Sequence, residues 1–423
     1  MKIKIRRRSA SAYFHCAVFM AILFACFHFN NVTIASIKIS ELAMLVMAPV
    51  LLLYIKSVNK YILLLGGFFL LLILATVVAN LSQEFYIDRL SLSIVKQPYF
   101  ISFVRFIEYV CCLAFGVYCY KSLQYFERQN FDINRLILFF LWINGAFSIL
   151  FLVLYVLHST GTINAWPTGF FYYGMRLKGF YDEGGPFGLM YATLFCLSTL
   201  IARRNLLLKL LFCLTVIAAE SKAGILMIIL WMAYHWYELL PKRGLLRPAA
   251  IVVGSALVIL VGSFIIENYI IIISNVQREV LLRPHDNNLV MGRVSGFFIT
   301  PKMIAQNPLL GVGMGNYSLV RNTPDYLGFF PPVEEWDLSG LGGLITLTAE
   351  SGIVGLLGFV TLIIALCRRL SKRVPTIFRN KLVLLFVLPF LLGVQLYFVY
   401  VWFSIGYILY LSSRHTPLPS ANA

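Results

Sequence analysis

Long apolar runs separated by short polar connections dominate the chain. A helix that spans a membrane needs about 20 residues at about 1.5 Å each, and the first half of the sequence offers six such runs. They lie near residues 12 to 29, 39 to 55, 61 to 80, 101 to 120, 136 to 157 and 187 to 202. Their connections alternate between basic and mixed-charge composition, which is typical of a polytopic membrane protein.

Two later stretches predict short helical hairpins. Residues 206 to 240 are too long for one span and have basic connections at both ends, so this segment must return to the side on which it starts. Its apex places Lys222 at or below the outer surface, where a cation needs a cavity or a partner. Residues 380 to 411 predict a second hairpin. Single spans lie between the hairpins, at 248 to 268 and 342 to 366.

The longest polar region, residues 267 to 341, falls between the predicted ninth and tenth spans and forms a large loop on the outer side. Within it, residues 291 to 317 contain Arg293, an apolar amphipathic segment and a run of three glycines. The glycines are Gly311, Gly313 and Gly315. They predict either a tight turn or a nest of backbone N–H groups that binds an anion.

Positive charge is concentrated on the predicted inner side. The formal net charge is +17, and 23 of the 35 Lys and Arg residues lie in connections on the side of the N-terminus. Only Glu127, Asp132 and Glu238 share that side. Because cytoplasmic loops are enriched in Lys and Arg, we expect a multi-pass protein of the bacterial inner membrane with both termini cytoplasmic. The charge therefore reports topology, and nucleic acid is not expected as a partner.

These patterns predict one all-α polytopic membrane domain over residues 1 to 423, with about 12 transmembrane helices. If residues 380 to 411 form a single span, the number of transmembrane helices is eleven. Hydrophobic residues make up 60% of the chain and charged residues 13%, whereas soluble domains are charged at about a quarter of their positions. The eight cysteines lie in or beside predicted spans without a CxxC motif. We therefore predict no disulfide framework, no metal site and no cofactor.

Four cations are predicted to lie near the outer membrane interface: Arg176, Lys178, Lys222 and Arg293. Together they indicate a bound anion at the level of the headgroups. A lipid-linked diphosphate suits them, because Arg offers bidentate hydrogen bonds and Lys a point charge. Contact with phospholipid headgroups is the alternative for each residue alone. For Lys222 and Arg293 together, the predicted depth and geometry favour the diphosphate.

Few acidic groups on the outer side are candidates for a general base. A sugar hydroxyl that acts as nucleophile needs such a base within hydrogen-bond reach. The candidates include Glu335 and Asp337, just before the tenth span, and Glu350, about two turns into that span. A solvated loop face is the alternative for the first two, and a helix-anchoring polar contact is the alternative for Glu350.

Four short segments resemble, in the same order, segments of the bacterial O-antigen polymerase and ligase superfamily (Wzy-like). They are RLKGFYDEGGPFG, SKAG, GRVSGFF followed by NPLLGVGMGNY, and LTAESGIVGLLGF, which together run from about residue 170 to 365. The Pro-Leu-Leu-Gly-x-Gly block and the Glu-x-Gly helix are the more specific matches. The resemblance implies a type C glycosyltransferase-like membrane fold, a periplasmic active site, and inverting, metal-independent chemistry.

The resemblance also implies roles for single residues. The two arginines with which the family contacts diphosphate map to Lys222 and Arg293, so the first site keeps its charge but lacks the fork of an arginine. A His-Asn pair, which many members and ligases especially carry nine residues before the Glu of the Glu-x-Gly helix, is replaced by Leu341 and Gly342. This departure favours the polymerase branch. It leaves Asp337 and Glu335 as the nearest candidates for the base.

We therefore expect a polysaccharide repeat-unit polymerase that transfers a growing glycan from undecaprenyl diphosphate onto an incoming lipid-linked repeat unit. Its expected partners are undecaprenyl-diphosphate-linked oligosaccharides, the lipid bilayer and a chain-length regulator protein. One alternative is a ligase that transfers the glycan to the lipid A core. An alternative of another class is a flippase or transporter; transporters usually show inverted repeats and broken helices, and the sequence shows neither.

Overall fold

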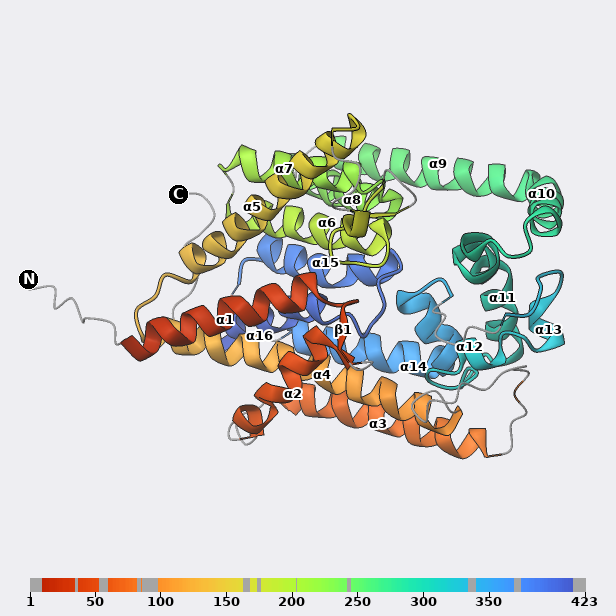
Figure 1. Ribbon diagram of the computed structural model, residues 1–423, viewed down its shortest axis with the longest axis horizontal. Helices are drawn as coiled ribbons and strands as arrows, with labels where there is room; N and C mark the ends of the chain where they lie inside the picture. Colours follow the sequence, from red (N-terminus) through yellow and green to blue (C-terminus); the bar gives the residue numbers. More distant parts are fainter. Residues whose placement is uncertain are drawn as a thin grey trace, which may run out of the picture. The chain divides into compact units, whose positions relative to one another are not determined.

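Each predicted apolar run contains a helix. The computed structural model describes residues 10–34, 37–52, 60–81, 85, 98–162, 168–172, 176–202, 204–241, 245–333, 340–368 and 374–413. Within these ranges the protein is mostly helical, and its strands form two small antiparallel hairpins, β1–β2 and β3–β4 (Figure 1). The first pairs Thr33 with Lys38, and the second pairs Tyr172 with Arg176.

The helices follow the predicted order closely. Up to the first helical hairpin they are α1 (Ala10–His28), α2 (Ile39–Leu52), α3 (Lys60–Asn80), α4 (Pro98–Arg128), α5 (Ile133–Ser159) and α6 (Gly184–Ile201). The strands are β1 (Thr33–Ile34), β2 (Ile37–Lys38), β3 (Phe171–Tyr172) and β4 (Arg176–Leu177), with the short helix η3 (Thr168–Phe170) before β3. The remaining long helices are α7 (Leu206–Ala218), α8 (Lys222–Leu239), α9 (Leu246–Glu267), α14 (Gly343–Arg368), α15 (Thr376–Leu391) and α16 (Phe403–Ser413), the last preceded by η6 (Val399–Trp402).

Both predicted hairpins consist of two helices. Residues 206 to 240 form α7 and α8 with a turn at residues 219 to 221, and residues 380 to 411 fall in α15 and α16. Of the predicted outer region, residues 267 to 333 are largely helical as well. It contains α10 (Tyr269–Leu282), the π-helical turn η4 (Asn287–Met291), α11 (Arg293–Gln306), α12 (Tyr317–Val320) and α13 (Pro324–Leu327).

Six helices in the described part of the chain are long and apolar enough to cross a membrane: α1, α3, α4, α5, α6 and α14. Their lengths range from 18 residues in Gly184–Ile201 to 29 residues in Phe100–Arg128. An 18-residue helix measures about 27 Å, which is close to the thickness of a bilayer core. The protein is therefore all-α and has several helices of membrane-spanning length and composition. The total of 12 spans stays a prediction.

Side-chain caps define where several helices begin. The Asp132 carboxylate accepts hydrogen bonds from the backbone N–H groups of Asn134 (3.0 Å) and Arg135 (3.3 Å) at the start of α5. The Asn205 side chain accepts from the N–H of Leu208 (3.3 Å) at the start of α7. Such caps satisfy backbone donors that have no acceptor within the helix. Polar residues between apolar runs thus fix the starts of α5 and α7.

The chain divides into two compact units. The first unit comprises residues 1–69, 106–228 and 359–423, and the second comprises residues 70–105 and 229–358. The predicted ligands Arg176, Lys178 and Lys222 belong to the first unit, whereas Arg293 and Glu350 belong to the second. Each unit is therefore described by itself.

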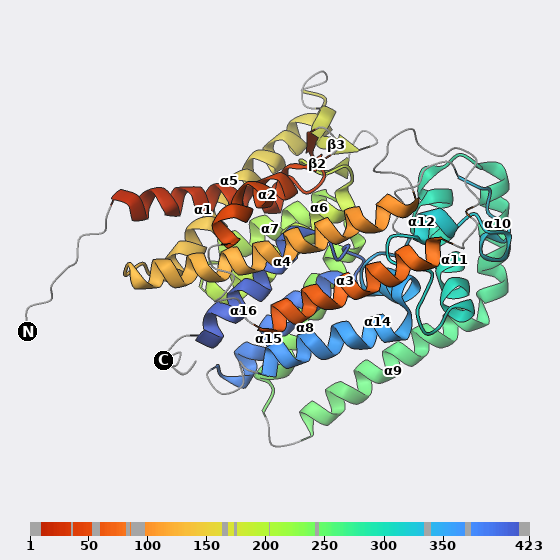
Figure 2. The same ribbon diagram turned by 90° about the horizontal axis from the view of Figure 1, so that it is seen from below.

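In the first unit, α5, α6 and α7 pack against one another (Figure 1), and α1 packs against α2 (Figure 2). Ser148 of α5 hydrogen-bonds to Thr215 of α7 and donates to the Leu211 carbonyl at 3.0 Å. At another contact, a Cβ atom at Gly406 of α16 would lie 2.6 Å from the Gly116 carbonyl oxygen of α4. Small residues and interhelical hydrogen bonds of this kind are typical of helix packing in membranes.

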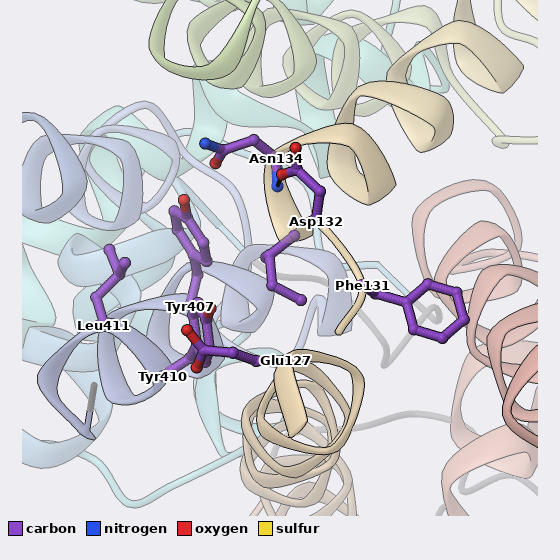
Figure 3. Close-up of a pocket in the computed structure, with 8 residues that line it drawn as sticks. Glu127, Phe131, Asp132, Asn134, Tyr407, Tyr410 and Leu411 are labelled. Atoms are coloured by element: carbon purple, nitrogen blue, oxygen red, sulfur yellow. Dashed lines mark hydrogen bonds between the residues drawn. The ribbon is translucent and has the colours of Figure 1, made fainter. Parts of the chain in front are cut away.

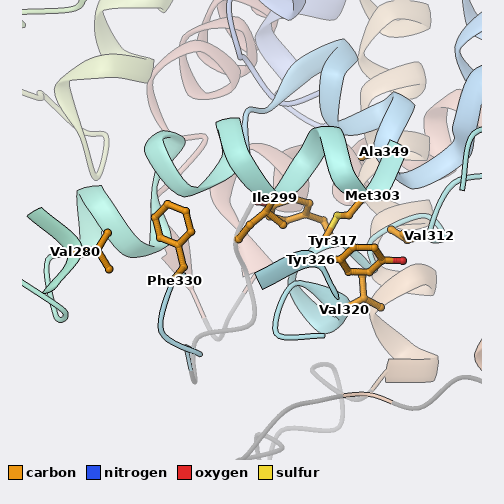
Figure 4. Close-up of a cluster of buried hydrophobic side chains, with 9 residues drawn as sticks. All are labelled: Val280, Ile299, Met303, Val312, Tyr317, Val320, Tyr326, Phe330 and Ala349. Carbon is orange, nitrogen blue, oxygen red and sulfur yellow. The ribbon is translucent and has the colours of Figure 1, made fainter. Parts of the chain in front are cut away.

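The second unit has a hydrophobic core of its own in the outer region (Figure 4). It is built from residues that lie far apart in the sequence: Val280, Ile299, Met303, Val312, Tyr317, Val320, Tyr326, Phe330 and Ala349. Figure 4 shows Ile299 and Met303 of α11 directed toward Tyr317 and Val320 of α12. The predicted outer loop is therefore a packed helical structure.

Candidate functional site

Lys222 is the first residue of α8 and lies at the apex of the first hairpin. Its side chain is exposed, and within the described ranges it has no hydrogen-bond or ion-pair partner. The preceding Ser221 is buried and caps α8: its Oγ accepts from the N–H of Gly224 at 3.1 Å and donates to the Gly185 carbonyl at 2.9 Å. The cap fixes the backbone from which Lys222 projects.

Close contact with α6 holds this apex in place. A Cβ atom at Gly188 of α6 would lie 2.2 Å from Cβ of Ser221, and one at Gly224 would lie 2.9 Å from the Gly188 carbonyl oxygen. Real Cβ atoms do not approach this closely, so the absence of side chains allows the two backbones to meet. The glycine of the SKAG segment therefore has a packing role.

Arg176 of β4 contacts the same apex. Its Nε donates to the Ala219 carbonyl at 2.9 Å, and its Nη2 donates to the Glu220 carbonyl at 3.4 Å. Both carbonyls follow the end of α7, where backbone acceptors have no partner within the helix. Arg176 is thus already bonded to the protein on one edge of its guanidinium. Lys178, two residues later, is half-buried.

In the second unit, residues 308 to 313, called the glycine block below, are joined to α14 by backbone hydrogen bonds. α14 is interrupted at Gly352, whose φ is +64° and ψ is −169°. In an unbroken helix the N–H groups of Ile353 and Val354 would bond to the carbonyls of Ala349 and Glu350. Here they donate to Pro308 (2.9 Å) and Leu309 (3.2 Å) instead.

The two carbonyls freed by the break are also satisfied by the glycine block. The N–H of Val312 donates to the Ala349 carbonyl at 2.9 Å, and the N–H of Gly313 donates to the Glu350 carbonyl at 2.7 Å. Residues 308 to 313 therefore replace the two helical hydrogen bonds that α14 loses. Residues 308 to 313 and α14 are therefore joined by four backbone hydrogen bonds.

Glycine is required on both sides of this contact. A Cβ atom at Gly311 would lie 2.4 Å from the carbonyl carbon of Glu350, and one at Gly352 would lie 2.1 Å from the Leu309 carbonyl oxygen. Both residues also have φ values in the left-handed region, +69° and +64°, which side chains disfavour.

The hydrogen bonds of residues 311 to 314 favour the tight turn over the anion nest. The N–H of Gly311 donates to the Asn307 carbonyl (3.0 Å), that of Met314 donates to Thr76 Oγ1 (2.8 Å), and those of Val312 and Gly313 bond to α14. These amides are already bonded within the protein and are not available to an anion.

Glu350 lies directly at this junction. Its side chain is buried, and its Oε1 accepts a hydrogen bond from the N–H of Tyr317 at 3.4 Å. Its backbone carbonyl accepts from Gly313. Glu350 therefore contacts the outer region through both its backbone and its side chain, which fits the anchoring alternative considered for it.

Arg293 is the first residue of α11 and is exposed. The N-cap residue, Gly292, provides no side-chain hydrogen bond to the first turn. The N-terminus of a helix carries a partial positive charge that favours anions. Arg293 adds a full positive charge to that end.

Sequence reasoning missed Arg321, a fully buried cation of the second unit. Its side chain is 1% exposed, and its Nη2 donates to the Val290 carbonyl at 3.0 Å. Burial lowers its pKa from the usual value for arginine, although nearby Tyr317 partly opposes this effect. Burial in turn raises the pKa of Tyr317. One feature of the sequence could have identified it: a lone arginine follows the apolar segment YSLV, in a region predicted to be a large outer loop.

The predicted bases Glu335 and Asp337 lie outside the described residues, as does Glu334. The residues that flank this segment in the sequence belong to the second unit. Val333 exchanges two hydrogen bonds with the Asn322 side chain, at 2.8 and 3.1 Å. A Cβ atom at Gly340 would lie 2.6 Å from the Tyr317 ring, so the two approach closely.

A separate small pocket lies on the predicted inner side, between the start of α5 and α16 (Figure 3). Its volume is about 110 Å³, and its polar lining includes Glu127, Asp132, Asn134 and Tyr407. None of the predicted site residues lines it. Across the described ranges no group of His, Cys, Asp and Glu residues could hold a metal ion.

Comparison with known proteins adds no assignment to this geometry. No model of a protein family matches the chain, and no curated protein sequence matches it.

Proposed function

We propose that this protein is a polysaccharide repeat-unit polymerase of the bacterial inner membrane. It would transfer a growing glycan from undecaprenyl diphosphate to the terminal sugar of an incoming lipid-linked repeat unit at the periplasmic face. Its substrates would be undecaprenyl-diphosphate-linked oligosaccharides, and a chain-length regulator protein is a candidate partner.

One observation carries the proposal: both cations that map to the diphosphate contacts of the family begin a helix. Lys222 begins α8, and Arg293 begins α11. A positive side chain at a helix N-terminus is electrostatically unfavourable by about 0.3–1 kcal/mol in isolation. A bound diphosphate removes that cost, because it interacts favourably with the side chain and with the helix end.

The proposed chemistry requires stabilisation of the leaving diphosphate and deprotonation of the acceptor sugar. Arg293 and Lys222 would hold the negative charge that develops on the diphosphate. An acid of the 334 to 337 segment, Glu335 or Asp337, would accept the proton of the attacking hydroxyl. Attack from the face opposite the diphosphate inverts the anomeric carbon, and no metal is needed when cations of the protein bind the leaving group.

The broken helix α14 is a feature also found in transporters, and the sequence did not predict it. In transporters such breaks typically leave backbone groups free to coordinate a substrate or an ion. In this chain the groups freed at Gly352 are bonded to residues 308 to 313. The break therefore supports a fixed structural role more than a transport path.

Substitution of Arg293 tests the proposal. We expect Arg293→Ala to lower polymer formation about tenfold or more, because a charge-assisted hydrogen bond contributes about 1.5–3 kcal/mol. Arg293→Lys should retain part of the activity. Arg283→Ala is the matched control, since Arg283 is exposed in the same region and pairs with Glu279 at 2.9 Å.

Polymer length would be read from lipopolysaccharide or capsule gels at equal membrane levels of each variant. Long-chain polysaccharide made at the normal level by Arg293→Ala would refute the assignment.

A further inference from the structure

The chain that follows the glycine block is bonded to α3 below the outer end of that helix. α3 has 21 residues and therefore measures about 32 Å, close to the thickness of a bilayer core. Its last residue, Asn80, exchanges two side-chain hydrogen bonds with Asn316, at 2.6 and 3.2 Å. One turn earlier in α3, Thr76 Oγ1 accepts a hydrogen bond from the N–H of Met314 at 2.8 Å. Met314 thus lies about 6 Å below the end of α3.

The contacts with α14 continue this descent. The N–H of Gly313 donates to the Glu350 carbonyl at 2.7 Å. The Leu309 carbonyl accepts from the N–H of Val354, one turn further along α14, at 3.2 Å. Because α14 begins on the predicted outer side, Leu309 lies about 6 Å deeper than Gly313. The glycine block therefore descends alongside a helix of membrane-spanning length.

The helix that leads to the glycine block, α11, has apolar side chains on two faces. Ile299 and Met303 are buried in the core of the second unit (Figure 4). Phe297, Pro301 and Ala305 recur every four residues along an exposed face, and Phe297 is 65% exposed. A helix that is apolar on both faces needs an apolar environment on each of them.

The exposed apolar stripe continues across the glycine block onto α14. Leu309 and Leu310, which follow α11, are 64% and 66% exposed. They lie next to Ile353 and Val354, two exposed residues of α14 whose N–H groups donate to residues 308 and 309. α14 is long and apolar enough to cross a membrane, so its exposed apolar face is expected to contact acyl chains. Continuity with that face identifies lipid as the partner of the stripe.

The backbone of the glycine block is suited to an apolar environment. A non-helical segment can enter a bilayer only where its backbone groups are bonded within the protein. The N–H of Gly311 donates to the Asn307 carbonyl at 3.0 Å, and four further backbone groups of residues 308 to 313 bond to α14. Lys302, exposed beside the stripe, has a side chain long enough to reach the headgroups.

We infer that the second half of α11 and the glycine block form a re-entrant segment, inserted among the acyl chains of the outer leaflet. The segment enters and leaves the bilayer on the same side, so the predicted side of every connection is unchanged. Lipid contact of this kind does not depend on polymerase activity.

Photo-cross-linking of the full-length protein in its membrane tests the insertion. Benzoylphenylalanine would be placed at Ala305 or at Leu310, both of which are exposed and therefore tolerate a larger side chain. Mass spectrometry of the illuminated protein then identifies phospholipid adducts and the part of the lipid that carries them. Leu357 of α14, 58% exposed, is the lipid-facing control. Arg283, exposed in the same unit and paired with Glu279, is the aqueous control.

We expect acyl-chain adducts at Ala305 and Leu310 in the same yield as at Leu357, and a loss of these adducts at Arg283. A yield at either position as low as that at Arg283 would overturn the insertion. Adducts confined to the glycerol or the headgroup would place the segment on the membrane surface and would overturn it as well. Cross-links to protein in place of lipid would show that a second copy or another chain covers the stripe, which also contradicts the insertion.

Discussion

Arg176, one of the residues predicted to bind an anion, forms two hydrogen bonds within the protein. Its Nε and Nη2 donate to the Ala219 and Glu220 carbonyls, so it joins the β3–β4 hairpin to the apex that carries Lys222. The position of Lys222 therefore depends on Arg176, whether or not Arg176 also contacts the substrate. A lysine in this place could not donate both hydrogen bonds, because its single ammonium lacks the planar fork of a guanidinium.

We expect Arg176→Lys to lower the free energy of unfolding by about 1–3 kcal/mol, because at least one carbonyl loses its donor. The melting temperature of the purified protein, followed by tryptophan fluorescence, measures this effect. Lys178→Ala is the control from the same strand hairpin and should melt like the unmodified protein. Equal melting temperatures for Arg176→Lys and the unmodified protein would show that the two hydrogen bonds do not support the apex.

Among the elements, α14 and the glycine block depend on each other. The break at Gly352 exposes four backbone groups, and residues 308 to 313 satisfy all four. A peptide group left without a partner in an apolar environment is costly, so neither segment would be stable in its observed conformation alone. This contact also fixes Tyr317, which packs beside Arg321 in the outer region.

Replacement of Gly352 should disrupt this contact specifically. An alanine there would have a strained φ of +64° and a Cβ atom 2.1 Å from the Leu309 carbonyl oxygen. Strain of this kind costs about 1–3 kcal/mol, and the clash adds to it. We expect Gly352→Ala to melt at a clearly lower temperature and to become sensitive to protease within residues 307 to 333.

Gly254→Ala in α9 is the matched control for this substitution, since a Cβ atom there meets nothing within 4 Å. It should retain the melting temperature of the unmodified protein. The same melting temperature and protease pattern in Gly352→Ala and Gly254→Ala would contradict the interlocked arrangement.

Helices and hairpins were predictable from the sequence because they depend on local patterns. Apolar runs and their basic connections located α7 and α8, with a turn beside Lys222. The break in α14 was not predictable in this way, since it results from contacts with residues about 40 positions away. Arg321 was missed for the same reason: its burial depends on Val290, 31 residues earlier. The sequence identified the glycines, but a tight turn could be distinguished from an anion nest only by the acceptors of the backbone N–H groups.

For the whole molecule, the charge distribution predicts which side of the membrane each connection occupies. Residues 267 to 333 and the apex with Lys222 should lie outside, and the connections at 128 to 135 and 202 to 206 should lie inside. This predicted topology would put all four predicted diphosphate-binding cations on one side of the bilayer.

Labelling of single cysteines in a cysteine-free background tests this topology. Cysteines at Arg283 and Asp325 should react with a membrane-impermeant maleimide in cells whose outer membrane is permeable. Cysteines at Arg135 and Arg204 should react only after lysis. All four native side chains are exposed, so accessibility within the protein does not limit the reaction. Labelling of Arg204→Cys from outside would reverse the predicted orientation.

The most direct test of the central claim is the distribution of glycan in a strain that lacks this protein. Glycans attached to the lipid A core and to the carrier lipid would be separated and their lengths measured. We expect the core to carry one repeat unit or none, and the long-chain ladder to return with the unmodified gene but not with Arg293→Ala. Long chains that accumulate on the carrier lipid would indicate a ligase, repeat units confined to the cytoplasmic face would indicate a flippase, and either result would contradict polymerase function.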